Sequence, residues 1–519
     1  MTKNKNTDGV QDNGSTGEDA ETAGPGTHAF DAGQAHQLAG NLEEAEREYR
    51  AAIDIQDEFF EAHVNLGVVL QGRGNASDAA TAFLRAIDLN PEMPEIHYAL
   101  GTVYQDLDRT GEAQACFQCA LDMDSGSVEA LNGLAICRQT LGDVEGAVEA
   151  FESAIGLNPD FAEARNNLGT LYSKLGRMDD ALACFQRAID INPVYAEAHR
   201  NYSHVLLLQG RFAEGWPEFR WRWHCRDFTS EKRIFPQAPW AGQPLKGKTI
   251  LVWGEQGVGD EIHFAEMVPD LFKAGARVIL ECEPRLMPLF RRSFPAVSCI
   301  SRQTPPAAEA LATGIDFQCP SGDLAGWLRT ERGDFPGSPS YLSANHGRVD
   351  ALKEAYQAGG RDLLVGIAWV SKNPEAGKIK SLDLADWRRM ADIPGVRFID
   401  LQYGDTIEER ARFEADTGAA ILHDDSIDQM ADLDAFSAQV AAMDLVISAS
   451  NTTVHMAGAL GVSTWVMLNT VPLCVWMLEG DTSPWYPSLR LFRQSQAGVW
   501  DDVVGKVAAA LKDLVAARG

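Results

Sequence analysis

Small and aromatic residues recur every 34 positions through the N-terminal part of the chain. One column of this pattern holds only small residues: Gly33, Gly67, Gly101, Ala135, Gly169 and Ser203. A second column holds Ala45, Ala79, Ala113, Ala147, Ala181 and Gly215, and a third holds Tyr49, Phe83, Phe117, Phe151, Phe185 and Phe219. Small residues mark where two helices cross closely, and an aromatic ring fills the space beside them. The pattern therefore predicts six consecutive helical hairpins.

Turn residues follow the same period. Glycines stand between the two helices of a unit at Gly40, Gly74, Gly142, Gly176 and Gly210, and prolines follow the second helix at Pro91, Pro159 and Pro193. Together these columns resemble the tetratricopeptide repeat over residues 28–223. Stacked hairpins of this kind form a groove that holds a peptide or a protein segment, so we expect a recognition role. The alternative is a spacer without a partner.

The last unit departs from the pattern. It ends in the segment GWPEFRWRW, which contains Trp216, Phe219, Trp221 and Trp223. The outer face of a terminal repeat is usually polar. We therefore expect these rings to pack the solenoid onto the next domain, and a ligand-binding surface is the alternative.

Beyond Trp223 the pattern changes to short apolar runs that alternate with helical segments. Two such series follow a Pro-rich stretch, and alternation of this kind predicts parallel sheets covered by helices. A linker around residues 335–360 separates the two series, and a helix near 498–517 closes the second. The expected divisions are a disordered tail at 1–26, the solenoid of about six repeats at 27–228, a linker at 229–248, a first α/β half at 249–345 and a second at 361–519.

The first apolar strand, near residues 248–253, is followed by the turn GEQGVGD and a helix beginning near Asp260. A strand, a Gly-rich turn and a helix let an anionic ligand approach the helix N-terminus. The glycines do not match the dinucleotide spacing, and no P-loop lysine follows. Hydride transfer and NTP hydrolysis are therefore not supported.

Composition narrows the partners and the compartment. The chain has 45 lysines and arginines against 74 aspartates and glutamates, a formal charge of −29, so we expect neither nucleic acid nor anionic membrane surfaces to bind it. The polar N-terminal segment 1–26 does not resemble a signal peptide, and no apolar run is long enough to span a bilayer. The nine cysteines do not form a metal motif. We expect a cytoplasmic protein that needs no metal ion.

Four segments of the second region carry a resemblance to a known family: GEQGVGDEIHFAEMVPDL, GIAWVSKN with KSLDLADW, LQYGD and SNTTVHMAGALG. In this order they resemble glycosyltransferases with the GT-B fold, in particular heptosyltransferases and the repeat-fused bacterial enzymes that glycosylate flagellin. The resemblance extends over both α/β halves. It implies an α plus α/β protein in which a TPR solenoid precedes a glycosyltransferase domain of two Rossmann-like halves, the second binding a nucleotide sugar.

The resemblance also assigns roles within the Gly-rich turn. It places Asp260 as the general base on the acceptor hydroxyl, with Gly257 and Gly259 beside the donor. A base within hydrogen-bond reach of the nucleophile is what inverting transfer requires. Asp260 could instead cap the following helix, and Glu261 is the nearest substitute for it.

The other three segments supply donor contacts in the family. The resemblance implies that Lys380 neutralises donor phosphate, with Lys372 and Lys378 as stand-ins. The remaining expected donor contacts are Gln402, Gly404, Ser450, Asn451, Thr452, Thr453 and His455. Amides and hydroxyls at a helix N-terminus suit a phosphate, although His455 could be structural and Gln402 with Gly404 could only turn the chain. Heptosyltransferases usually carry Asp-Thr where this chain has Ser450-Asn451, so the resemblance leaves the identity of the donor open.

Our leading hypothesis is therefore a metal-independent glycosyltransferase that transfers a sugar to Ser or Thr of an acceptor protein captured by the solenoid. The flagellar relatives suggest flagellin as the acceptor and a CMP-nonulosonic acid as the donor, and a UDP-sugar is the other donor considered. One alternative is an enzyme that acts on a cell-envelope saccharide. Another is a scaffold or chaperone that binds a nucleotide sugar without turnover.

Overall fold

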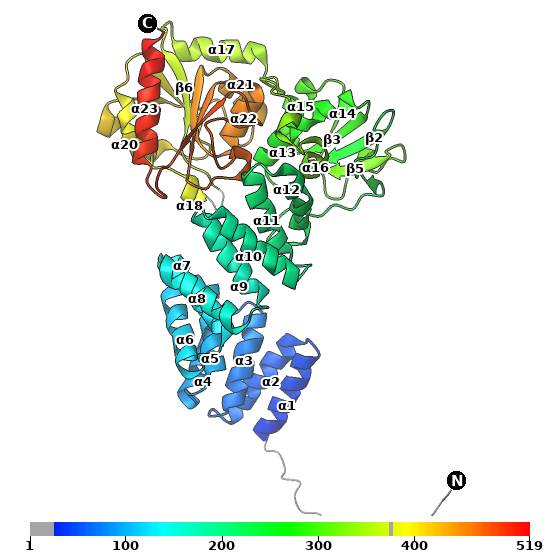
Figure 1. The fold of residues 1–519 in the computed structure, drawn as a ribbon, viewed down its shortest axis with the longest axis vertical. Helices are drawn as coiled ribbons and strands as arrows, with labels where there is room; N and C mark the ends of the chain where they lie inside the picture. Colours follow the sequence, from blue (N-terminus) through cyan, green and yellow to red (C-terminus); the bar gives the residue numbers. More distant parts are fainter. Residues whose placement is uncertain (1–24, 373–376, 519) are drawn as a thin grey trace, which may run out of the picture. The chain divides into compact units, whose positions relative to one another are not determined.

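The computed structural model describes residues 25–372 and 377–518 (Figure 1). The chain divides into two compact units, residues 1–167 and 168–519. The units are described separately below. The tail predicted for residues 1–26 falls outside the described residues except for Pro25 and Gly26, which begin the first helix.

The first unit consists of helical hairpins. Its helices are α1 (Pro25–Leu38), α2 (Leu42–Ile55), α3 (Phe60–Gly72), α4 (Ala76–Leu89), α5 (Pro94–Asp106), α6 (Thr110–Met123), α7 (Val128–Leu141), α8 (Val144–Leu157) and the start of α9 (Ala162–Lys174). The small-residue column lies against the aromatic column, as predicted. A Cβ atom added at Gly67 would lie 2.6 Å from Phe83, and one at Gly101 would lie 2.6 Å from Phe117. The glycines therefore permit the close helix crossing within each hairpin.

Left-handed residues end the first helix of each hairpin. Gly40, Gly74 and Gly142 have φ angles of 78°, 79° and 88°. Only glycine adopts this conformation without a steric penalty, which explains the turn column in the sequence. In the third hairpin Asp108 takes the same place with φ 57°.

The second unit begins with the last repeats. They contain the rest of α9, then α10 (Met178–Ile191), α11 (Ala196–Leu208), α12 (Phe212–Phe219) and the 3₁₀ helix η1 (Arg220–His224). Trp216 donates its indole N–H to the carbonyl of Arg329 at 2.8 Å. The ring of Trp223 lies 5.3 Å from that of Trp253. These contacts confirm that aromatic residues of the last repeat pack against the α/β region.

The first α/β half contains a five-stranded parallel sheet in the order β1-β5-β2-β3-β4. Its strands are β1 (Ala238–Pro239), β2 (Thr249–Trp253), β3 (Arg277–Cys282), β4 (Ser298–Ser301) and β5 (Phe317–Pro320). Its helices are α13 (Val258–Phe264), η2 (Ala265–Met267), α14 (Val268–Lys273), η3 (Pro284–Leu286), α15 (Met287–Ser293), η4 (Ala308–Leu311), η5 (Ser321–Leu324), α16 (Ala325–Leu328) and η6 (Arg332–Asp334).

The second α/β half contains a six-stranded parallel sheet in the order β11-β10-β9-β6-β7-β8. Its strands are β6 (Leu363–Ala368), β7 (Val396–Asp400), β8 (Ile421–Leu422), β9 (Leu445–Ala449), β10 (Thr464–Leu468) and β11 (Leu489–Arg493). Its helices are α17 (His346–Gln357), α18 (Gly377–Lys380), η7 (Leu384–Trp387), α19 (Arg388–Ala391), α20 (Ile407–Thr417), α21 (Leu433–Ala441), α22 (Thr452–Leu460), η8 (Cys474–Trp476) and α23 (Asp501–Ala516).

Both sheets reverse their strand order beside their first central strand. In the second half the chain runs outward from β6 through β7 to β8, and then returns to the other side of β6 with β9. In the first half it runs from β2 to β4 and returns with β5. A doubly wound sheet binds ligands at the carboxyl ends of the strands that flank such a reversal. The central strands β2, β6 and β9 are buried along their whole length, which explains their unbroken apolar runs.

Two segments expected to be linkers belong to the α/β halves. Residues 229–248 contain β1, which pairs with β5 and extends the first sheet. The segment around 335–360 contains α17, whose Tyr356 donates a hydrogen bond to Asp424 at 2.6 Å. The sequence missed both because β1 is only two residues long and α17 shows little apolar periodicity.

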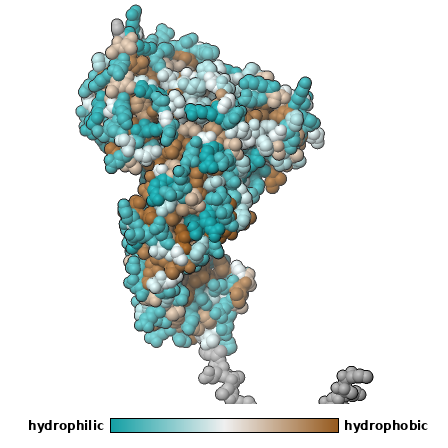
Figure 2. Space-filling model, in the orientation of Figure 1, coloured by the Kyte–Doolittle hydropathy of each residue, from teal (hydrophilic) through white to brown (hydrophobic). Residues whose placement is uncertain are grey.

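Hydrophilic and apolar side chains are interspersed on the face shown in Figure 2. Within residues 25–372 and 377–518, no helix is both long enough and apolar enough to cross a membrane.

Candidate active site

A cavity of about 580 Å³ lies where three parts of the second unit meet. The first α/β half contributes the turn 256–260, and the second half contributes Lys380 and residues at the start of α22. The last repeat contributes Arg200, Phe219 and Arg222. The cavity brings together most of the predicted site residues, namely Gly257, Gly259, Asp260, Lys380, Ser450, Asn451, Thr452 and His455.

The Gly-rich turn is held in place by backbone and side-chain contacts at its start. The amide of Gly254 donates to the carbonyl of Glu281 at 2.9 Å. Gln256 has φ 59°, an uncommon conformation for a residue with a side chain, and its amide donates to Ser230 Oγ at 2.5 Å. Such strained residues persist where the surroundings hold them, often at functional sites.

Asp260 caps a helix and also lines the cavity. Its Oδ2 accepts a hydrogen bond from the amide of Gly257 at 3.1 Å, so it caps the start of α13. The half-buried side chain also lines the cavity. Burial raises the pKa of Asp260, and the Gly257 bond and the charge of Lys380 oppose that shift. A carboxylate with a raised pKa is a better proton acceptor from a hydroxyl.

Gly259 allows α13 to pass close to α22. A Cβ atom at Gly259 would lie 3.4 Å from both His455 Cδ2 and Thr452 Oγ1. Glycine at this position therefore keeps the start of α22 open toward the turn.

Lys380 is the lysine that the structure places in the cavity. Its side chain is buried, whereas Lys372 and Lys378 are exposed. Burial lowers the pKa of Lys380, and Asp260 opposes this shift. Glu261, the expected substitute for Asp260, instead pairs with Arg302 at 2.6 Å and does not line this cavity.

The start of α22 forms another wall. Asn451 is the N-cap, and its Oδ1 accepts from the amide of Thr453 at 3.0 Å while its Nδ2 donates to Val370 O at 3.2 Å. The N-terminus of a helix carries partial positive charge and favours a bound anion. Thr453 is buried behind the wall, so the structure does not bring it into the cavity with its neighbours.

His455 lies one turn into α22 and is held by aromatic neighbours. Its Nδ1 is 2.9 Å from the hydroxyl of Tyr486, and its ring stacks on Trp476 with 5.3 Å between centroids. Burial, with the charge of Lys380, lowers the pKa of His455 to about 3. His455 is therefore neutral at physiological pH. Trp476 also donates to Ser450 Oγ at 2.7 Å.

Gln402 and Gly404 do not line the cavity. The Oε1 atom of Gln402 accepts from the amides of Trp369 and Val370 at 2.9 and 2.7 Å. Gln402 therefore holds the end of β6. Gly404 has φ 92° and turns the chain. A Cβ atom there would lie 2.0 Å from Lys372 Nζ.

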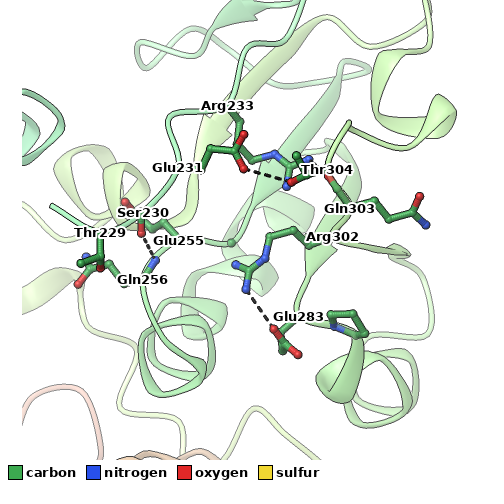
Figure 3. Close-up of a pocket in the computed structure, with 12 residues that line it drawn as sticks. Thr229, Ser230, Glu231, Arg233, Glu255, Gln256, Glu283, Arg302, Gln303 and Thr304 are labelled. Atoms are coloured by element: carbon green, nitrogen blue, oxygen red, sulfur yellow. Dashed lines mark hydrogen bonds and ion pairs between the residues drawn. The ribbon is translucent and has the colours of Figure 1, made fainter. Parts of the chain in front are cut away.

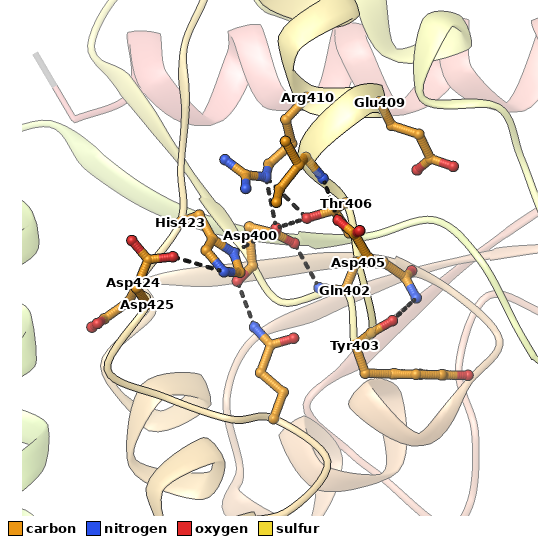
Figure 4. Close-up of polar contacts among 12 residues, drawn as sticks. Asp400, Gln402, Tyr403, Asp405, Thr406, Glu409, Arg410, His423, Asp424 and Asp425 are labelled. Carbon is orange, nitrogen blue, oxygen red and sulfur yellow. Dashed lines mark hydrogen bonds and ion pairs between the residues drawn. The ribbon is translucent and has the colours of Figure 1, made fainter.

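A buried carboxylate organises the same loop (Figure 4). Asp400, at the end of β7, accepts from Thr406 Oγ1 at 2.6 Å and from the amide of Gln402 at 2.9 Å. Arg410 and His423 lie 3.1 and 2.9 Å from its Oδ2. This network accounts for the position of Gln402, and of its neighbours only Tyr403, whose carbonyl accepts from Gln402 Nε2 at 3.2 Å, lines the cavity.

Sequence reasoning missed the charged residues that the repeat contributes. Arg222 is 1% exposed and its guanidinium contacts Glu255 at 2.7 Å and Asp323 at 2.7 Å. Arg200, on α11, pairs with Asp227 at 2.6 Å at the cavity wall. The segment RWRW could have revealed them. We expected its tryptophans to pack on the next domain, and an arginine buried with them needs an oppositely charged partner.

Two further cavities lie in the second unit. A cavity of about 410 Å³ shares the walls Thr229 and Gln256 with the first one and is also lined by Arg233 and Arg302 (Figure 3). Another of about 410 Å³ lies between the last repeats and the second α/β half, with His204 on one side and Ile379 on the other. Burial and the charges of Lys380 and Arg200 lower the pKa of His204 to about 4.

The described residues contain no group of three or more His, Cys, Asp or Glu side chains placed to hold a metal ion.

Comparisons with known proteins concern mainly the repeats. Family models for the TPR repeat match residues 72–108 and 140–176, and models for the tetratricopeptide repeat match 94–126 and 162–195. Among solved structures, MamA from Desulfovibrio magneticus RS-1 is 18% identical, covers 34% of this chain and 99% of its own, and has a TM-score of 0.32. A thermophilic TPR protein of Thermus thermophilus is 20% identical, covers 35% and 99%, and has a TM-score of 0.30.

A longer similarity links this chain to Protein FlbA of Caulobacter vibrioides. The two are 34% identical over 333 residues, which is 60% of this chain and 54% of FlbA. The chain thus spans about half the length of this curated relative. The N-terminal solenoid is therefore built of tetratricopeptide repeats and is followed by a region of parallel sheets and helices, and Protein FlbA is a homologue of the chain.

Proposed function

We propose that this chain is a cytoplasmic, metal-independent glycosyltransferase of the GT-B type that modifies Ser or Thr of an acceptor protein. One observation carries the proposal: the repeat, the first α/β half and the second α/β half all line one cavity. That cavity holds a carboxylate, a buried lysine and a helix N-terminus. Transfer of a sugar from a phosphate leaving group requires a base, and it is helped by a cation and an anion-binding site. The carboxylate, the lysine and the helix N-terminus could supply them.

Asp260 is the base in this proposal. The acceptor hydroxyl passes its proton to the Asp260 carboxylate as its oxygen bonds to the anomeric carbon of the donor sugar. The bond between that carbon and the donor phosphate oxygen breaks at the same time, and both electrons leave with the phosphate. Asp260 lies in the first α/β half, and Lys380 and the start of α22 in the second half line the same cavity.

Lys380 and the start of α22 hold the leaving group. Negative charge develops on the phosphate, and a buried cation stabilises it more strongly than an exposed one because little water screens it. Ser450 and Thr452 add hydroxyl groups at the same wall. The donor is then a nucleotide sugar held by the second α/β half, a CMP-nonulosonic acid or a UDP-sugar.

The repeat makes a protein the preferred acceptor. Arg200 of α11 lines the catalytic cavity, and His204, one helical turn later on the same helix, lines a second cavity beside Ile379. A polypeptide on the last repeats would therefore reach the catalytic cavity without leaving the protein surface. Tetratricopeptide solenoids bind protein segments. The resemblance to repeat-fused flagellar enzymes makes flagellin the first acceptor to test.

Intact-mass spectrometry of candidate acceptors tests the proposal. Flagellin is isolated from cells that carry the wild-type gene and from cells that carry Asp260→Asn. Asparagine keeps a side-chain oxygen that can accept from the Gly257 amide, so the cap survives while the base is lost. We expect flagellin from the wild-type cells to carry an added mass of the size of a sugar, and flagellin from the variant cells to lack it.

Two lysines of one short helix supply a matched control. Lys380 is buried in the cavity and Lys378 is exposed, both on α18. Lys380→Met should abolish the added mass, and Lys378→Met should retain it. The wild type and the three variants could instead all yield an acceptor of the same mass that the repeats still bind. This result would contradict transfer and support a scaffold that binds without turnover.

A further inference from the structure

One tyrosine hydroxyl joins two histidines from the two α/β halves. The hydroxyl of Tyr486 lies 2.9 Å from Nδ1 of His455 and 3.1 Å from Nδ1 of His263. His455 and Tyr486 belong to the second half, and His263 belongs to α13 of the first half. Tyr486 is 1% exposed and His263 is 6% exposed. The three side chains thus form a chain of hydrogen bonds whose inner members, Tyr486 and His263, are shielded from water, while His455 is half-buried and lines the cavity.

The number of protons in this chain is limited. A tyrosine hydroxyl has one proton to donate, and a neutral imidazole carries one N–H on either Nδ1 or Nε2. Both histidines are neutral, because burial lowers the pKa of His455 to about 3 and that of His263 well below its usual value. The Tyr486 hydroxyl has a third hydrogen-bond partner, the hydroxyl of Tyr341, which donates its own proton to Ile262 O at 2.8 Å. When the Tyr486 hydroxyl donates to one Nδ1, its oxygen accepts an N–H from the other Nδ1.

The two histidines then hold opposite tautomers. If His455 accepts the hydroxyl proton at Nδ1, its own proton lies on Nε2, and His263 is protonated at Nδ1. Nε2 is the remaining polar atom of a ring that lines the catalytic cavity. An anion in that cavity favours the Nε2–H form, since this form offers it a donor.

We propose that Tyr486 is a positioning residue that couples the tautomers of His263 and His455, so that His455 presents a neutral Nε2–H donor to an anionic ligand. The identity of that anion as a donor phosphate rests on the proposed function. The coupling itself does not, because it follows from the hydrogen bonds of the ligand-free protein. A neutral donor adds a directed hydrogen bond beside Lys380 without adding a second charge.

Histidine tautomers can be measured in the full-length chain labelled with ¹³C and ¹⁵N at histidine. The Cδ2 and ring-nitrogen chemical shifts distinguish Nδ1–H from Nε2–H, and His263→Gln and His455→Gln assign the two rings. We expect opposite tautomers in the ligand-free protein. With saturating UDP as the probe, His455 should be the Nε2–H form and His263 the Nδ1–H form.

Tyr486→Phe tests the coupling, and Tyr356→Phe is its matched control. Tyr356 is also buried, and its hydroxyl has two partners, Asp424 and Gln439, neither of them a histidine. Tyr486→Phe should leave His455 in a mixture of tautomers and remove any response of His263 to UDP. Tyr356→Phe should leave the wild-type pattern unchanged.

Two results would overturn the inference. The first is the same tautomer at both rings, for example two Nδ1–H groups with the hydroxyl turned toward Tyr341. The second is a wild-type pattern that persists in Tyr486→Phe. Opposite tautomers without UDP binding would instead support the coupling and count against the proposed donor site.

Discussion

Replacing Arg222 with methionine is expected to destabilise the second unit strongly. Its guanidinium is 1% exposed and donates to Glu255 at 3.0, 2.7 and 2.9 Å and to Asp323 at 2.7 Å. The side chain of Glu255 is 0% exposed. Methionine fills similar space but leaves this carboxylate buried without a cation. Breaking a buried pair in this way costs about 3–5 kcal/mol of unfolding free energy.

Arg220 supplies the control, since it lies on the same 3₁₀ helix. Its side chain is 39% exposed and 4.0 Å from Asp323. Because surface pairs contribute about 0–1 kcal/mol, Arg220→Met should change the free energy of unfolding by no more than that. Urea unfolding followed by tryptophan fluorescence measures the free energy of unfolding of both variants. The two units of the chain should give separate transitions, and the transition of the second unit is the one to compare.

The loss of unfolding free energy in Arg222→Met should also depend on pH. Burial raises the pKa of Glu255, and Arg222 opposes that shift, so removing the arginine raises the pKa further. A group whose folded pKa exceeds its unfolded pKa penalises folding as the pH rises through the folded value. The variant should therefore lose more stability at pH 8 than at pH 5, and Glu255→Gln in the same chain should recover part of the loss. A loss equal to that of Arg220→Met, or no recovery in the double variant, would refute the buried-pair account.

Three further predictions concern the site, one buried carboxylate and the repeats. Because burial raises the pKa of Asp260, the rate of transfer should fall with acid at a higher pH than an exposed aspartate would give, and Asp260→Asn should lower the rate at least about 100-fold in a pH-rate assay. Burial raises the pKa of Glu281 from 4.5 to about 7, so its contribution to stability is present below pH 4.5 and is lost as the pH rises through 7. Over this pH range the free energy of unfolding, measured with urea, should therefore fall by about 3 kcal/mol less in Glu281→Gln than in the wild type. The same pH dependence in both proteins would contradict this. Gly101→Ala should destabilise the first unit by about 1–3 kcal/mol because the new Cβ meets Phe117 at 2.6 Å, whereas Gly111→Ala has open space and should be neutral or stabilising in thermal unfolding.

The repeats could be predicted in detail because their contacts are local in sequence. Gly101 and Phe117 touch within one hairpin, so the periodic columns of small and aromatic residues report the packing directly. The central strands β2, β6 and β9 were also recognisable, because they are buried along their length and are therefore uniformly apolar.

The candidate site was predictable only in part. Residues that follow a strand at a sheet reversal reach the cavity, as Asp260 and Ser450 do. Spacing does not say which way each side chain points, which is why Gln402 and Thr453 were included although neither lines the cavity. The partners Arg222 and Glu255 come from the last repeat and the first α/β half of the second unit, and no periodic pattern connects them.

The short strand β1 makes the first sheet depend on residues that precede its central strand β2. Ala238 and Pro239 pair with Phe317 and Gln318 of β5, and Trp240 donates its amide to Gln318 O at 2.8 Å. A chain cut at residue 249 would leave β5 as an open edge, with unpaired amides and carbonyls that can pair with another molecule. Residues 238–240 thus protect the α/β region from self-association, and expression of this region alone should begin before them.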